Sequence, residues 1–304
     1  MIDGLVLGQM TPDSTVPSSD ASAQGARSAS ADRAPAALAA DAPSSPGNGP
    51  LLTLRGISKH FGPVQALSGI DLEIVPGEVT ALAGDNGAGK SVLIKTISGI
   101  WQPDDGQIVW DGKPVQIHTP KDAAALGIAT VYQDLALCDN LDIVQNVYLG
   151  REISPHGILD ETTMELTAKE TLSGLSVTSV RSIRQPVGSL SGGQRQAVAV
   201  ARAVMFTARL VIMDEPTAAL GVAQTAMVLD LIRRLSANGI AVMVVSHNLN
   251  DVFAVADRIA ILHLGTMVGH GPTSDFDTQR VVELITTGTY GGAAGNGGAG
   301  AREH

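Results

Sequence analysis

The stretch that decides the fold is Val79-Thr80-Ala81-Leu82-Ala83-Gly84-Asp85-Asn86-Gly87-Ala88-Gly89-Lys90-Ser91. Its mainly apolar beginning, Val79 to Ala83, predicts a buried strand, and Ser91 to Ile97 predicts the helix that follows it. From Gly84 to Ser91 the chain satisfies the pattern Gly-x-x-x-x-Gly-Lys-Ser/Thr, in the strand-to-helix setting that this pattern requires. The alternative is a glycine-rich turn that happens to contain a lysine.

This pattern is typical of a loop that wraps around phosphate groups. Glycines let backbone N–H groups curl round an anion without clashes of Cβ atoms, and the helix N-terminus adds partial positive charge. In such a loop Lys90 reaches the β- and γ-phosphates of a nucleoside triphosphate, and the hydroxyl of Ser91 ligates Mg²⁺. We therefore predict that nucleotide is bound by the whole loop: Gly84, Asp85, Asn86, Gly87, Ala88, Gly89, Lys90 and Ser91.

A second apolar strand is predicted to end in two acids. Leu210 to Met213 is continuously apolar, and Asp214 and Glu215 follow it. Asp214 is predicted to hold Mg²⁺, directly or through water, and Glu215 to be the base that orients and polarises the attacking water. An Asp-Glu pair after a strand is more often the start of a solvated loop. Its distance downstream of the phosphate loop favours the catalytic interpretation.

A third candidate site begins with a serine and two glycines, in Leu190-Ser191-Gly192-Gly193-Gln194. Ser191 can cap the helix that begins near it, and the glycines expose backbone N–H groups. The sequence therefore predicts a second anion site, separate from the first, made by Ser191, Gly192, Gly193 and Gln194. The alternative is a plain Gly-Gly turn with a serine cap.

The order of these motifs resembles the ATP-binding cassette (ABC) family, over roughly residues 51 to 288. The resemblance implies a fold of the α/β class: a P-loop NTPase with a RecA-like core, an antiparallel β subdomain and an inserted helical subdomain. It also implies that ATP and Mg²⁺ are sandwiched between two copies of the chain, with the Ser191 to Gln194 signature of one copy completing the site of the other. A two-fold dimer makes both composite sites equivalent.

Three further residues match positions of the family. Phe61 matches the aromatic residue that stacks on adenine, and a core phenylalanine is the alternative. Gln133 matches the glutamine that senses Mg²⁺ and the γ-phosphate, and His247 matches the histidine that contacts the γ-phosphate. The resemblance thus implies a catalytic set and a metal set, which are Glu215, His247 and Gln133 for catalysis and Ser91, Gln133 and Asp214 for Mg²⁺.

One departure from the family pattern is informative. Gly221 follows Ala219-Leu220, where many members have an aspartate that couples the two ATP sites, so the mode of coupling is open. Together with Asp85 and the run Leu149 to Glu152, Gly221 makes the sequence resemble the ATP-binding subunits of bacterial importers of ribose, xylose and fructose. The chain has a single cassette, as fructose-type members do, and this implies a homodimer on the cytoplasmic face of the membrane. The homodimer would lie beneath two permease subunits, to which an extracytoplasmic sugar-binding protein delivers the sugar.

The rest of the chain divides by composition. Residues 1 to 50 are rich in Ala, Ser, Pro, Asp and Gly and are predicted to be a disordered leader, and residues 289 to 304 a flexible Gly/Ala tail. Between them, alternating strands around Leu52 to Ile57 and Ile70 to Ile74 predict an antiparallel sheet. Gln107 to Trp110 predicts a strand that enters an Asp-Gly turn. Continuously apolar runs predict buried parallel strands, and residues 134 to 188 predict an inserted helical lobe.

Composition excludes several classes of protein. The net charge of −10 argues against a nucleic-acid partner, because phosphate backbones are bound by clusters of Lys and Arg. The single cysteine, Cys138, excludes an internal disulfide framework. No run approaches the roughly 20 apolar residues of a membrane-spanning helix. The chain is therefore expected to reach a membrane only through a partner.

Three rival functions stay open at this point. The chain could be an ABC protein outside transport, although one acidic cassette with a short helical lobe does not favour a ribosomal or repair factor. It could bind ATP for regulation without turnover, which the presence of Glu215 and His247 disfavours. It could also serve the transport of a different solute, because the solute does not touch this kind of subunit.

Overall fold

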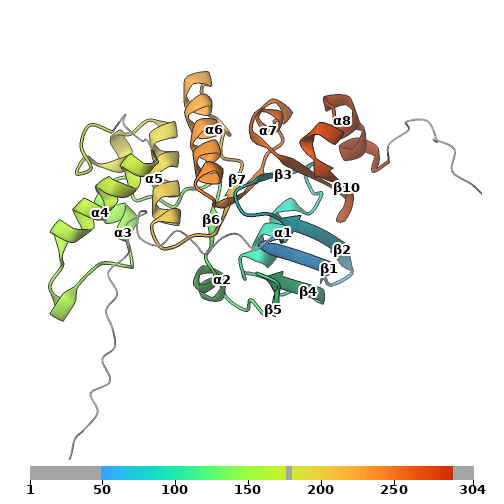
Figure 1. Cartoon of the computed structure of the whole chain (residues 1–304), viewed down its shortest axis with the longest axis horizontal. Coiled ribbons are helices and arrows are strands. Elements are labelled where there is room, and N and C mark those ends of the chain that lie inside the picture. Colours follow the sequence, from blue (N-terminus) through green and yellow to red (C-terminus); the bar gives the residue numbers. More distant parts are fainter. Residues whose placement is uncertain (1–48, 176–179, 290–304) are drawn as a thin grey trace, which may run out of the picture. The chain divides into compact units, whose positions relative to one another are not determined.

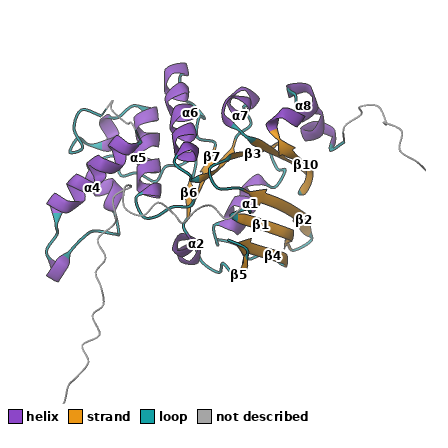
Figure 2. Cartoon of the chain, in the orientation of Figure 1, coloured by secondary structure: helices purple, strands orange, loops and turns teal. Residues whose placement is uncertain are grey.

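The computed structural model describes residues 49–175 and 180–289, and the predicted leader and tail lie outside it except for residues 49, 50 and 289. Within the described residues the strands form two sheets (Figures 1 and 2). One is four-stranded, in the order β2-β1-β4-β5, and the other is six-stranded, in the order β10-β9-β3-β8-β7-β6. Helices α2 to α8 and the phosphate-loop helix α1 complete the fold.

The four-stranded sheet is antiparallel, as the alternating sequence predicts. It contains β1 (Leu52–Phe61), β2 (Val64–Ile74), β4 (Asp105–Trp110) and β5 (Lys113–Val115). Asp111 and Gly112 connect β4 to β5, and both have positive φ, 53° and 73°, as a tight hairpin turn requires. The predicted strand and its turn are confirmed.

The six-stranded sheet has a parallel centre. Its strands are β3 (Val79–Gly84), β6 (Ile128–Val131), β7 (Leu210–Asp214), β8 (Ala241–Val245), β9 (Arg258–His263) and β10 (Thr266–Pro272). Only β10 runs antiparallel, against β9. The three continuously apolar runs are β3, β7 and β8, so the prediction of buried parallel strands is confirmed; β6 and β9 were not predicted.

Alternate residues of the central strands fill two separate cores. In β7, Val211 and Met213 belong to one apolar cluster, and Leu210 and Ile212 to another. Because successive side chains of a strand point to opposite faces, this division shows that both faces of the sheet are covered. The first core includes α5 and α6, and the second includes β1, β2 and α1. This double burial explains why the sequence of β7 shows no alternation.

Two helices begin at predicted motifs, α1 at the phosphate loop and α5 at the Ser191 signature. The described helices are α1 (Lys90–Ile97), α2 (Pro120–Leu126), α3 (Ile143–Tyr148), α4 (Glu161–Gly174), α5 (Gly192–Val204), α6 (Val222–Ala237), α7 (Leu249–Val255) and α8 (Thr278–Thr287), with short 3₁₀ turns at Pro155–Gly157, Val187–Ser189 and Thr273–Asp275. No helix of the described part of the chain is both long and apolar enough to cross a lipid bilayer.

Helices α3 and α4 occupy the segment predicted as a helical lobe, and both pack against α5. Arg184 lies within hydrogen-bonding distance of three carboxylates of this segment: Asp142 (3.4 Å), Glu161 (3.2 Å) and Glu165 (3.0 Å). Its guanidinium therefore ties the start of α3 to α4. Since α5 belongs to the same apolar cluster, the helical packing continues beyond residue 188.

Candidate functional site

Four predicted site segments leave the same edge of the parallel sheet. Neighbouring parallel strands β3, β8, β7 and β6 all end at this edge, because carboxyl ends of parallel strands lie side by side. Gly84 ends β3, Asp214 ends β7, and Gln133 and His247 follow β6 and β8 by two residues. The topology thus brings together groups that lie up to 163 residues apart in the sequence (Figure 1).

The phosphate loop is closely packed against two other segments. A Cβ atom at Gly89 would lie only 2.8 Å from the carbonyl oxygen of Ala66 in β2, and φ of Gly89 is 105°, so only glycine fits there. The N–H of Gly265, in the β9–β10 turn, donates to the carbonyl oxygen of Ala88 in the loop (2.9 Å). The carbonyl oxygen of Gly265 accepts from Ser68 N–H (2.7 Å). The turn therefore joins the loop to β2.

Lys90 lies inside the curve of its own loop. Its Nζ donates to the carbonyl oxygens of Gly84 (2.7 Å) and Asp85 (2.9 Å). These bonds hold the ammonium group against the start of the loop, and neighbouring Ser91 is exposed. A cradle of backbone N–H groups with one fixed cation suits a phosphate chain.

Asp214 is partly buried at the end of β7. Burial, followed by the neighbouring charge of Glu215, raises the pKa of the Asp214 carboxyl, and Lys90 and Lys95 oppose that shift. The carboxyl thus lies close enough to the phosphate-loop lysine for their charges to interact. Lys95, on α1, is a member of this group of charges that sequence reasoning missed. Nothing in its motif distinguished it from a surface lysine.

The side chains of Glu215 and His247 are in contact across neighbouring strand ends. Nδ1 of His247 lies 2.8 Å from Oε2 of Glu215, whose side chain is 16% exposed. The backbone N–H of Glu215 donates to the carbonyl oxygen of Val245 (2.8 Å), and φ of Glu215 is 50°, a conformation that non-glycine residues rarely adopt. The backbone therefore aims this carboxylate at His247 instead of continuing β7.

Gln133 is exposed in the loop after β6, and α5 holds that loop in place. The guanidinium of Arg202 donates to the carbonyl oxygens of Leu135 (2.8 Å) and Ala136 (2.9 Å), and Arg195 forms a short ion pair with Asp139. Both arginines belong to the helix that begins at the Ser191 signature. They were missed at the sequence level, because an arginine in a helix has no distinguishing pattern.

Phe61 ends β1 with 40% of its surface exposed, so the alternative of a core phenylalanine does not hold. Its ring meets Trp101 edge to face, with the two centroids 4.7 Å apart. The Nζ of Lys59 lies 5.5 Å from the centroid of the Phe61 ring. An exposed aromatic ring is suited to stack on a planar base.

Ser191 caps α5, as predicted. Its Oγ accepts from the N–H of Gln194 (3.4 Å), and Oε1 of Gln194 accepts from the N–H of Ser191 (2.9 Å), which completes a capping box. A Cβ atom at Gly192 would lie 2.7 Å from Leu220, so the signature packs against the segment before α6. The two predicted anion sites stand at the starts of different helices, α1 and α5.

The residues at the sheet edge have the order and chemistry of a P-loop ATPase. The family described as ABC transporter matches residues 67–218. The fructose import ATP-binding protein of Rhizobium meliloti is 50% identical over 244 residues, which cover 78% of this chain and 94% of that protein. The xylose/arabinose import ATP-binding protein of Sulfolobus acidocaldarius is 46% identical over 241 residues, covering 79% and 96%.

A solved structure agrees with these sequences. The dimeric bacterial ABC transporter cassette MJ0796 superposes with a TM-score of 0.61 at 25% identity, and the match covers 73% of this chain and 98% of that one. The chain belongs to the ABC transporter family, as an ATP-binding protein of the group that includes those for xylose, fructose and ribose import.

Proposed function

We propose that this chain is the ATP-hydrolysing subunit of an ABC importer for a monosaccharide. The observation that carries the proposal is its likeness, along almost their whole length, to the xylose/arabinose and fructose import proteins. Both are single-cassette relatives, as the sequence predicts for this chain. Glu215 and His247 are paired, so the chain has the groups needed for turnover as well as binding.

Hydrolysis would rest on six residues near this edge of the sheet. Glu215 accepts a proton from the attacking water, and His247 holds the Glu215 carboxylate in position. Lys90 carries positive charge inside the loop, where a phosphate chain binds. Ser91, Asp214 and Gln133 would hold Mg²⁺, which neutralises phosphate charge when bound. Among the described residues no three His, Cys, Asp or Glu side chains converge as ligands, which suits an ion held mainly by phosphates and a hydroxyl.

A second copy of the chain would complete each site. The capped helix start at Ser191 carries the backbone N–H groups of Gly192 and Gly193 in its first turn, and it belongs to a different helix from the one that follows the phosphate loop. A two-fold partner can bring Ser191, Gly192, Gly193 and Gln194 onto the phosphates that Lys90 holds. The dimeric state of the cassette MJ0796 supports this arrangement. Binding of ATP closes such a dimer, and hydrolysis removes the link between its halves.

The permease would contact the groove between the sheet and the helical segment. A hollow of about 320 Å³ lies there, and its lining includes small side chains, two arginines and an aromatic ring: Ala123, Thr130, Ala199, Arg151, Arg202 and Phe206. A short helix of a membrane-embedded partner fits a hollow of this kind. Such docking would place the chain at the cytoplasmic face of the membrane, with an extracytoplasmic sugar-binding protein on the other side.

The test combines turnover with transport. Glu215→Gln should leave ATP binding intact and lower turnover by at least about 100-fold. In cells that lack this gene, the wild-type chain should restore uptake of one sugar among xylose, arabinose, fructose and ribose, and the variant should not. Turnover with no effect on any of these sugars would indicate a different solute. Wild-type rates from the variant would refute the assignment of the base.

Genes beside this one provide an independent check. A neighbouring multi-spanning permease and an extracytoplasmic sugar-binding protein would support the proposal, and binding assays on the latter would identify the solute. Neighbours for a ribosomal or repair function would contradict it.

A further inference from the structure

The Phe61–Trp101 pair is an exposed aromatic contact in a chain with few aromatic residues. The chain contains only four Phe, three Tyr and two Trp. Phe61 is nevertheless 40% exposed, and its ring packs against Trp101 at an interplanar angle of 69°. A core does not need this contact, since neither residue belongs to a buried cluster. The contact between Phe61 and Trp101 is therefore better explained by a function at the surface than by packing of the core.

Trp101 is attached to the helix of the phosphate loop. Its backbone N–H donates to the carbonyl oxygen of Lys95 (3.1 Å), in α1, and the Nζ of Lys95 lies 4.7 Å from the centroid of the indole ring. Helix α1 begins at Lys90, the lysine of the phosphate loop. The position of the Trp101 ring is thus set by the element that holds the phosphates.

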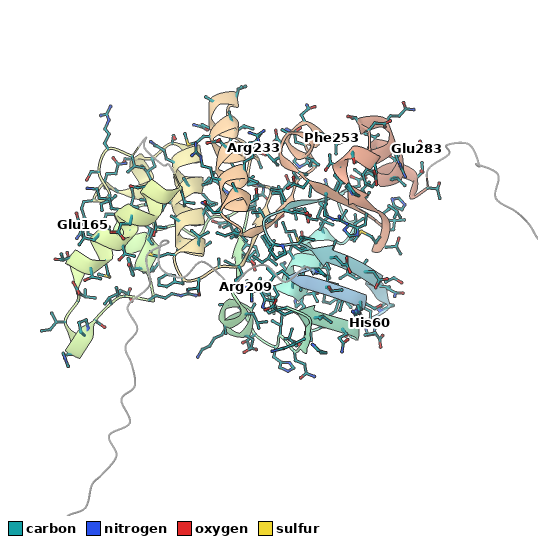
Figure 3. All side chains as sticks on the ribbon, viewed as in Figure 1. His60, Glu165, Arg209, Arg233, Phe253 and Glu283 are labelled. Carbon is teal, nitrogen blue, oxygen red and sulfur yellow. The ribbon has the colours of Figure 1, made fainter. Side chains whose placement is uncertain are left out.

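Phe61 is attached to a different element. It ends β1 and pairs with Val64 of β2. Lys59 and His60 both contact Asp104, at 2.9 Å and 3.3 Å, so the end of β1 is bound to the residue before β4. Figure 3 labels His60. The ring contact with Trp101 is therefore where the antiparallel sheet meets the helix of the phosphate loop.

We propose that Trp101 is a positioning residue for the base of ATP. The inference rests on the proposed function, in which Phe61 stacks on adenine. Trp101 meets the Phe61 ring edge to face, Lys59 Nζ lies 5.5 Å from the ring centroid, and the exposed part of the ring is assigned to the base. Because Trp101 moves with α1, it fixes the separation between the base-binding ring and the phosphate-binding loop. Trp101 acts through Phe61 and does not touch the phosphates.

The test separates base binding from phosphate binding. With the full-length protein, we would measure the affinities for ATP and for inorganic tripolyphosphate, which lacks the base, in wild type, Trp101→Ala, Trp101→Phe and Phe61→Ala. Trp101→Ala should weaken ATP binding by about 3- to 10-fold, as expected for loss of an aromatic contact, and leave tripolyphosphate binding unchanged. Trp101→Phe, which keeps an aromatic edge, should restore most of the affinity. In steady-state assays the KM for ATP should rise by a larger factor than kcat falls.

A matched control uses another ring that contacts a cation. Phe276 lies 5.1 Å from the guanidinium of Arg280, in the C-terminal part of the chain. Phe276→Ala should leave both affinities unchanged. Thermal unfolding of each variant shows whether it is folded.

Three outcomes would overturn the inference. If Phe61→Ala loses ATP affinity and Trp101→Ala does not, Trp101 has no positioning role, and the proposed site at Phe61 stands. If Trp101→Ala loses tripolyphosphate affinity equally, the ring supports the phosphate loop and not the base. If neither substitution affects ATP, the base does not stack on Phe61, and that part of the proposed function fails as well.

Discussion

The imidazole of His247 is held 2.8 Å from the carboxylate of Glu215, so the ends of β7 and β8 meet through the two side chains proposed to govern hydrolysis. The peptide bonds of the same strands are also joined, because the N–H of Glu215 donates to Val245. Backbone and side chain thus fix the carboxylate together. A general base needs this kind of fixed geometry relative to its water.

His247→Ala should lower kcat by about 10- to 100-fold, because a hydrogen bond to a charged group contributes about 1.5 to 3 kcal/mol. The Kd for ATP should stay near that of wild type, since Lys90 and the loop are unaffected. Steady-state ATPase assays with a separate binding measurement check this. A rise in Kd with unchanged kcat would show that His247 does not position Glu215.

Asp214→Asn should stabilise the protein at pH 7 while abolishing Mg²⁺-dependent turnover. The pKa of Asp214 is raised in the folded state, so the folded chain takes up this proton at higher pH than the unfolded chain. Protonation of Asp214 contributes to the free energy of unfolding, and this contribution is lost as pH rises through the folded pKa. Asparagine has no such titration, so the variant keeps its stability at pH 7. The gain over wild type should therefore shrink as pH falls through the same range.

The measurement for Asp214 is urea unfolding without nucleotide at several pH values. Asp230→Asn is the control, because Asp230 is an exposed partner of Arg234. It should change the free energy of unfolding by less than about 0.5 kcal/mol. A destabilised Asp214→Asn protein at pH 7 would contradict the prediction.

Gly221→Asp should be tolerated and slightly stabilising. Gly221 caps α6 with φ −74°, and a Cβ atom there would meet nothing within 4 Å. Aspartate is a better N-cap than glycine by a few tenths of a kcal/mol. If the family's aspartate couples the two ATP sites, the variant should also show a steeper ATP dependence of hydrolysis. An unchanged Hill coefficient would show that this position does not limit coupling.

Gly239→Asp is the matched control for Gly221→Asp. A Cβ atom at Gly239 would also meet nothing within 4 Å, but its φ is 82°. The strain of that backbone should cost about 1 kcal/mol. Thermal unfolding of the two variants should therefore show shifts of opposite sign.

Arg202→Ala should destabilise the protein by about 1 to 3 kcal/mol, because two carbonyl oxygens of the Gln133 loop lose their donor. It should also lower kcat, since that loop carries Gln133. Arg233→Ala is the control: Arg233, labelled in Figure 3, donates to the carbonyl oxygen of Ala254 on an exposed surface. Urea unfolding and ATPase assays compare the two. Equal effects would mean that Arg202 is no more than an ordinary surface arginine.

The sequence predicted the central strands and the residues at their ends, because each motif contains its own strand. Leu210 to Met213 is apolar throughout and Asp214 follows it, so the same short stretch predicted both the strand and the candidate site residue at its end. Strand β6 was not predicted because it has four residues, and β9 because it begins with Arg258 and ends with His263. A strand of four residues is too short to show periodicity, and polar residues at both ends of a strand shorten its apolar run.

Contacts between motifs were not predictable in the same way. The pairing of Glu215 with His247 depends on β7 lying beside β8, and the order of strands in a sheet is not written in any local pattern. Arg195 and Arg202 act on a loop more than 50 residues away along the chain. Their function depends on how α5 packs, which only the tertiary fold determines.

Gly265 has a practical consequence for anyone who engineers this protein. A tight hairpin on the surface is the usual choice for inserting a peptide tag or a fluorescent reporter. Here the β9–β10 turn bonds to Ala88 and Ser68, and a Cβ atom at Gly265 would lie 2.7 Å from the carbonyl oxygen of Ala66. An insertion there would pull on the phosphate loop itself. A label is better placed on the exposed face of α8, around Val282.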